Sequence, residues 1–85
     1  MPYTVYILHS SQLNKYYVGQ TGDELNDRIR RHLSDHKGFT SKAKDWLLVH
    51  TEIFPDRLHA AKREREIKGW KSSLRIKALI LTSLH

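Results

Sequence analysis

Five side chains in this sequence carry the groups needed to hydrolyse a phosphodiester with a single metal ion. They are two phenols, a guanidinium, an imidazole and a carboxylate, on Tyr6, Tyr17, Arg28, His32 and Glu64. A guanidinium can neutralise charge on a phosphate, and a carboxylate can bind a divalent cation through its oxygens. A phenol or an imidazole can move a proton or orient a water molecule. The set indicates a nuclease site if the fold brings these side chains together.

Local patterning predicts the elements that would position them. Tyr3 to His9 and Tyr16 to Gln20 are rich in aromatic and β-branched residues and flank a polar turn, which predicts a β-hairpin. Trp46 to Phe54 predicts a third strand. Capping residues and apolar spacing predict three helices, over Glu24 to Ser34, over Arg57 to Lys68, and from Ser72 or Ser73 onward. The expected order is β-β-α-β-α-α, an α+β arrangement.

Apolar spacing also predicts which helix faces point inward. The expected inward residues are Leu58, Ala61 and Ile67 in the second helix and Leu74, Ala78 and Leu81 in the last. Gly69 is expected to end the second helix. The segment from His36 to Asp45 contains a glycine, hydroxyl residues and three lysines without apolar periodicity. It is therefore predicted to be a mobile basic loop.

Length, composition and charge limit the classes of protein. A chain of 85 residues with 39% apolar residues can fill one core, so residues 1–85 are expected to form a single domain. The absence of cysteine excludes disulfides and thiolate zinc sites. The formal charge of +6 makes nucleic acid the first candidate partner. No signal-like segment and no apolar run of about 18 residues is present, so we expect no membrane association and a cytoplasmic location.

Helix geometry adds information on three of the five side chains. At about 100° per residue, Arg28 and His32 lie beside one another and flank an apolar stripe, so both should edge a cleft. Glu64 lies within the apolar arc of its own helix, where an ionised carboxylate needs a cation, a metal or hydrogen-bond donors. Its partner stays open at this point. It could be Arg28, Lys68 at the helix edge, or a metal ion.

These motifs resemble those of the GIY-YIG nuclease superfamily. Thr4-Val5-Tyr6 is followed after ten residues by Tyr17-Val18-Gly19, and then by Arg28 and His32 on one helix and Glu64 on the next. The run Ala61–Trp70 is similar to the tails of short, stand-alone GIY-YIG domain proteins. The resemblance spans nearly the whole chain. It implies a small three-stranded antiparallel sheet flanked by about three helices.

The resemblance also implies an activity, that of a metal-dependent endonuclease on DNA, in repair or recombination, with RNA left open as a substrate. Glu64 would hold one Mg²⁺ or Mn²⁺ ion, and Arg28 would neutralise the phosphate. Tyr17 would orient or deprotonate the attacking water. Since a phenol has a reference pKa of about 10, His32 would share that step. Tyr6 would position the nucleophile or the phosphate. The residues expected to bind substrate are Gly19, Lys42, Lys44 and Lys68.

The chain departs from the family pattern in three places. Thr4 stands where the first motif names glycine, and Val18 stands where the second names isoleucine. A lysine sometimes found between the second motif and Arg28 is absent. A separate DNA-binding domain would not fit in 85 residues, so specificity is expected from the small domain itself, from a protein partner or from a homodimer. One alternative is a catalytically weak or inactive nucleic-acid-binding module on the same scaffold, whose binding would survive a chelator. Another is a protein-interaction domain, whose association with DNA would not depend on salt.

Overall fold

The computed structural model describes residues 2–34 and 45–83, with the side chains of residues 31–34 excepted. The described elements follow the order β-β-α-β-α-α, as the sequence predicts. Their bounds are Tyr3–Ser10 for β1, Lys15–Thr21 for β2, Leu25–Ser34 for α1, Leu47–Phe54 for β3, Arg57–Gly69 for α2 and Ser73–Thr82 for α3. The α+β fold class is confirmed. Nearly all of the predicted basic loop lies outside the described residues.

The sheet has the strand order β2-β1-β3, and both strand pairs are antiparallel. The β1–β2 register places Tyr6 opposite Gly19 and Leu8 opposite Tyr17. In β1 the four residues from Val5 to Leu8 are buried, with exposed fractions of 1% or less. Because successive side chains of a strand point to opposite faces, a strand buried in this way must be covered on both faces.

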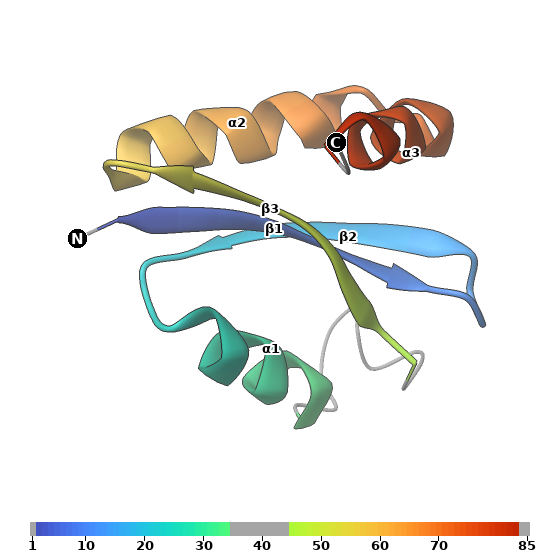
Figure 1. Cartoon of the computed structure of the whole chain (residues 1–85), viewed down its shortest axis with the longest axis horizontal. Helices are drawn as coiled ribbons and strands as arrows, with labels where there is room; N and C mark the ends of the chain where they lie inside the picture. Colours follow the sequence, from blue (N-terminus) through green and yellow to red (C-terminus); the bar gives the residue numbers. More distant parts are fainter. Residues whose placement is uncertain (1, 35–44, 84–85) are drawn as a thin grey trace.

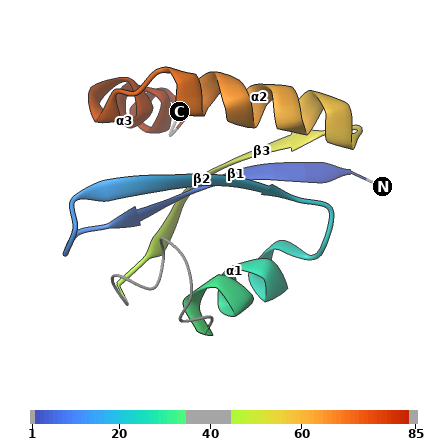
Figure 2. The same cartoon turned by 180° about the vertical axis from the view of Figure 1, so that it is seen from behind.

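Helices cover the two faces of the sheet. Figures 1 and 2 show α2 and α3 against one face and α1 against the other. The core is accordingly in two parts. The part beneath α2 and α3 contains Val5, Ile7, Val18, Ala60, Ile67 and Ile76. The part on the α1 side contains Tyr6, Leu8 and Trp46, with Leu13, Tyr17, Leu25 and Ile29 packed against it. Each fully buried large apolar side chain contributes about 1.5–3 kcal/mol to folding.

Side-chain caps define where the last two helices begin. Asp56 accepts a hydrogen bond from the His59 N–H at the start of α2, and Ser72 accepts one from the Arg75 N–H at the start of α3. Of the two serines that the sequence left open for the last helix, Ser72 is the cap. A cap of this kind stabilises a helix by about 1 kcal/mol.

The inward faces of these helices were predicted wrongly in part. Leu58 is 77% exposed, and the buried residues of α2 are Ala60 and Ile67. In α3 the buried residue is Ile76, whereas Leu74, Ala78 and Leu81 are all exposed. Among the residues described, no helix is both long and apolar enough to cross a membrane.

Gly69 is the last residue of α2, as the sequence predicts. Beyond it, Lys71 adopts the left-handed conformation, with a φ of 50°. The Trp70 and Lys71 N–H groups donate to the last carbonyls of the helix, those of Ile67 and Lys68. A position that glycine or asparagine usually fills is therefore held by a lysine.

Candidate active site

Tyr6 is fixed in place by the glycine opposite it. A Cβ atom on Gly19 would lie 2.6 Å from the Tyr6 hydroxyl oxygen and 2.7 Å from the ring carbon that bears it. The phenol therefore lies directly across the Gly19 backbone, and only 1% of Tyr6 is exposed. The resemblance implied that Gly19 binds substrate. The group that lies against Gly19 in the structure is the Tyr6 side chain.

The Tyr6 hydroxyl interacts with Arg28 of α1. Burial raises the pKa of Tyr6 above its usual value and outweighs the hydrogen bond and positive charge of Arg28, which act in the opposite direction. Tyr6 is therefore a neutral phenol at physiological pH, able to hydrogen-bond but not to act as a base. Tyr17 and Glu64 also act electrostatically on Tyr6. Four of the five predicted catalytic residues thus lie in one neighbourhood.

Arg28 is half-buried on the side of α1 that faces the sheet. Its Nε atom is buried and has no hydrogen-bond partner among the described residues. A guanidinium can donate five hydrogen bonds, and a donor left without an acceptor is unfavourable. The side chain is therefore held beside Tyr6 with donor capacity that the described protein groups do not fill.

Glu64 approaches the same neighbourhood from α2, on the other side of the sheet. Its side chain is 20% exposed and lies 2.8 Å from the Lys68 Nζ. Of the partners left open by the sequence, the structure shows Lys68. Glu64 and Lys68 also line a shallow pocket of about 240 Å³ with Ala61 and Arg65. The carboxylate is therefore accessible at the edge of the helix and not enclosed in the core.

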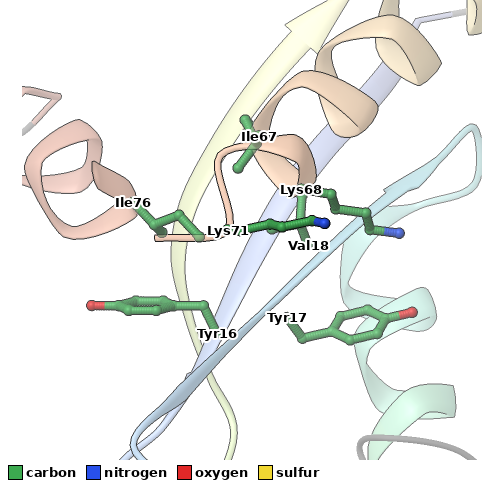
Figure 3. A pocket seen from close by; sticks show the side chains of 7 residues that line it. All are labelled: Tyr16, Tyr17, Val18, Ile67, Lys68, Lys71 and Ile76. Carbon is green, nitrogen blue, oxygen red and sulfur yellow. The ribbon is translucent and has the colours of Figure 1, made fainter. Parts of the chain in front are cut away.

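Tyr17 connects the two sides of the site. It lies on the edge strand β2 and packs against the core on the α1 side, and it also lines a groove that reaches Lys68. Figure 3 shows the Tyr17 ring and the Lys68 side chain directed to the same side, away from Tyr16. The site is therefore built around the edge of β2, with α1 on one side of the strand and α2 on the other.

A network on the opposite side of α2 sets the orientation of that helix. Arg63, the residue before Glu64, donates to both carboxylate oxygens of Glu52 on β3, at 2.8 and 3.2 Å. His50 Nε2 lies 2.8 Å from the same carboxylate, and His50 Nδ1 lies 3.1 Å from the Ser83 hydroxyl oxygen. Since adjacent helix residues are about 100° apart, holding Arg63 against β3 directs Glu64 toward β2. The sequence analysis did not identify this network.

Burial would raise the pKa of Glu52, but hydrogen bonds from Arg63 and His50 outweigh it and lower the pKa below its usual range. The pKa of Arg63 is raised, chiefly by its hydrogen bond to Glu52. Both shifts favour the charged pair. The network therefore contributes to stability at neutral pH.

The remaining predicted site residues are described less fully. The backbone of His32 lies in α1, but its side chain is outside the described part of the structure. Lys42 and Lys44 also lie outside the described residues. Their proposed roles stay predictions.

The described side chains offer few ligands to a divalent cation. Among those side chains, no three from histidine, cysteine, aspartate or glutamate are grouped so as to hold a metal. Mg²⁺, however, is often bound by one or two carboxylates, several waters and the phosphates of a substrate. One accessible carboxylate fits that mode of binding. The Glu64–Lys68 ion pair would have to open for the cation to bind.

Comparison with known proteins gave one family and one solved structure. The family model described as the GIY-YIG catalytic domain matches residues 2–77. A similar fold is the solution NMR structure of the UPF0213 protein BH0048 from Bacillus halodurans, with 28% identity and a TM-score of 0.54. The alignment covers 96% of this chain and 84% of that one. No match was found among curated proteins.

Proposed function

The chain belongs to the GIY-YIG catalytic domain family, a nuclease superfamily, and we propose that it is an active, metal-dependent endonuclease that hydrolyses phosphodiester bonds in DNA. The observation that supports this most directly is the neighbourhood shared by Tyr6, Tyr17, Arg28 and Glu64. These residues come from four different elements, and Tyr17, Arg28 and Glu64 all influence the pKa of Tyr6, which supports a shared site. Repair or recombination is the cellular role that such an activity would serve.

The side chains divide the work of hydrolysis. Arg28 binds the phosphate and offsets its charge with its guanidinium group, whose Nε donor has no hydrogen-bond partner among the described residues. Tyr6 is a positioning residue, because it is buried and holds the guanidinium. Tyr17, at the open edge of β2, orients the attacking water, and His32 shares the proton transfer. Attack in line with the leaving oxygen would produce a 5′-phosphate and a 3′-hydroxyl.

Glu64 would hold one Mg²⁺ or Mn²⁺ ion through its carboxylate oxygens. When bound, such an ion supplies Lewis-acid polarisation of the phosphate and lowers the pKa of a coordinated water. Because one protein carboxylate is a weak site, the affinity for the ion should depend on nucleic acid being present.

The test is cleavage of a labelled panel of single-stranded, duplex, nicked, flapped and four-way-junction DNA, together with RNA. Each substrate is incubated with Mg²⁺, with Mn²⁺ or with a chelator. Glu64→Gln keeps the side-chain shape and removes the charge, so it should abolish cleavage. Glu66→Gln is the matched control, since Glu66 lies on the same helix, 52% exposed, and should retain activity.

The same experiment separates the alternative of a nucleic-acid-binding module without catalysis. That alternative is favoured by the Glu64–Lys68 ion pair, which places a protein cation where a metal ion would bind. Binding that survives the chelator, with no cleavage of any substrate by the parent chain, would replace the proposed activity with this one. Cleavage that disappears with the chelator and with Glu64→Gln would exclude it. A specificity-determining protein partner or homodimer stays a prediction.

A further inference from the structure

A groove at the junction of β2, α2 and α3 adjoins the neighbourhood of Tyr6, Tyr17, Arg28 and Glu64, which we call the catalytic neighbourhood. Its volume is about 360 Å³. Its floor is apolar and consists of Tyr16, Val18, Ile67 and Ile76. Its rim carries Lys68 and Lys71, both exposed. Tyr17 lines the groove and also belongs to the catalytic neighbourhood, so the two are continuous (Figure 3).

Lys71 occupies this rim at an energetic cost to the fold. Its φ of 50° places a side chain with a Cβ atom in the left-handed region, where glycine would be less strained. The other non-glycine residue with a positive φ among those described is Asn14, which tolerates that region better. A strained backbone at the edge of a site is a reason to look for a function of the side chain. Here the side chain places an ammonium group over an apolar floor.

The chemistry of the groove restricts what it can bind. An apolar floor with ammonium groups on its rim fits a ligand that has a flat, weakly polar part and an anionic part. A nucleotide with an unpaired base has both, because its base can stack on an aromatic or apolar surface while its phosphate contacts a lysine. In a duplex the bases are stacked on one another, and the floor would have no base to contact.

A neighbouring pocket continues the same path. It has a volume of about 280 Å³ and shares Tyr16 with the groove, and it is also lined by His9, Ser73 and Lys77. The rings of Tyr16 and His9 are 4.7 Å apart, so His9 supports the Tyr16 side chain from one side. Tyr16 therefore lies between the groove and this pocket, and each of them is lined by a lysine. Two successive nucleotides of one strand could occupy the two sites.

We infer that the groove binds an unpaired nucleotide adjacent to the bond that is cleaved, with its base on the apolar floor and its phosphate on Lys71. This inference rests on the proposed nuclease function and adds a substrate class to it. The substrates are strands with at least one unpaired nucleotide beside the scissile phosphate. Lys71 is the residue that binds the flanking phosphate.

The first test is a comparison of three ligands in the presence of a chelator, so that binding is measured without cleavage. The ligands are a short oligothymidylate, an abasic deoxyribose-phosphate oligomer of the same length, and a duplex of the same length. The abasic oligomer should bind about tenfold more weakly than the oligothymidylate, within the range of one stacked base. Equal binding of these two, or tighter binding of the duplex, would overturn the assignment of the base to the groove.

The second test is Lys71→Gly, which removes the charge and relieves the backbone strain. The thermal midpoint of unfolding should stay the same or rise, so a loss of binding could not be attributed to misfolding. The salt dependence of oligothymidylate binding should fall by the equivalent of about one phosphate contact. Lys62→Ala is the control, because Lys62 is exposed on α2 and lies about 200° around the helix from Glu64.

If Lys71→Gly and Lys62→Ala bind the oligothymidylate equally well, the assignment of the flanking phosphate to Lys71 is wrong. Neither binding test depends on catalysis. If the chain shows the expected binding but cuts no substrate, the assignment of the groove as a nucleotide site stands and the proposed nuclease activity is wrong. A chain that cuts DNA but binds the abasic oligomer as well as the oligothymidylate would keep the activity and lose the groove.

Discussion

At the scale of single residues, the candidate site depends on the missing side chain of Gly19 as well as on the side chains that carry chemistry. The sequence motifs identified Tyr6, Tyr17, Arg28 and Glu64, because their chemical types and spacing are distinctive. They did not reveal that the Tyr6 ring lies across the Gly19 backbone. That contact joins two strands and depends on the β1–β2 register, which patterning alone does not specify.

Gly19→Ala should therefore reduce both stability and activity. The added methyl group would lie 2.6 Å from the Tyr6 hydroxyl oxygen, and the buried phenol can move only by disturbing Arg28. Overpacking of this kind costs about 1–3 kcal/mol. The measurements are urea unfolding and cleavage of the best substrate from the panel.

Gly69→Ala is the matched control for that substitution. A Cβ atom at Gly69 meets nothing within 4 Å, and the residue lies in the last turn of α2. Alanine should be neutral there or should stabilise the helix by up to about 1 kcal/mol. Equal effects of the two substitutions would contradict the role assigned to the Gly19–Tyr6 contact.

At the scale of the elements, the order of strands and helices was predictable and the inward faces of α2 and α3 were not. Capping residues and β-rich runs are local signals, and the cap of α3 is Ser72, one of the two serines that the sequence left open. The inward face of α3 could not be predicted from local signals of this kind. Apolar residues lie almost all round this helix, so more than one stripe fits the helical period. Packing against the sheet selects the stripe with Ile76, which no local pattern specifies.

Alanine substitutions in α3 distinguish the two stripes. Ile76→Ala should lower the free energy of unfolding by about 2–4 kcal/mol, because Ile76 is 8% exposed and belongs to the core. Leu74→Ala should change it by less than about 0.5 kcal/mol, since Leu74 is 77% exposed. Denaturant unfolding of the two variants gives both values. If Leu74→Ala lowered the free energy of unfolding more than Ile76→Ala, the inward face predicted from the sequence would be favoured instead.

The Glu52–Arg63 pair predicts how stability depends on pH. The pKa of Glu52 is lower in the folded chain than in the unfolded chain. Its contribution is therefore complete above the unfolded value of about 4.3 and is lost as the pH falls through the folded value. Glu52→Gln should lower stability at neutral pH by about 1–3 kcal/mol, because Arg63 loses a charged acceptor.

The pH profile of Glu52→Gln separates this effect from general acid denaturation. Unfolding midpoints measured from neutral pH down to strongly acidic pH should converge for the parent and the variant as Glu52 becomes protonated. A constant difference at every pH would mean that the lost stability does not come from the charge of Glu52. Glu66→Gln, which alters the more exposed partner of Arg63, should show a smaller difference.

At the scale of the whole molecule, the charge of +6 and the small size set the conditions for substrate binding. The described chain measures 32 × 27 × 24 Å. In a molecule of this size, the candidate site, the groove and the neighbouring pocket lie within a short distance of one another. Net charge was readable from composition. The continuity of the groove with the site was not, because it depends on where the α2–α3 junction lies against β2.

The affinity for single-stranded DNA should fall with rising salt in proportion to the phosphates contacted. If Arg28, Lys71 and Lys77 contact two to four phosphates, the slope of log affinity against log salt concentration should be about −1.5 to −3. Fluorescence anisotropy with a chelator present measures this slope. A slope near zero would favour the protein-interaction alternative.

The strand order has a consequence for how the protein behaves at high concentration. Both outer strands of a sheet can recruit another chain, but β2 borders the candidate site and the groove that Lys68 and Lys71 line. The other outer strand, β3, carries the exposed side chains of Leu47 and Ile53. Strand-mediated aggregation should therefore begin at β3. A charged residue in place of Ile53 would protect the purified protein from aggregation while leaving the site on β2 intact.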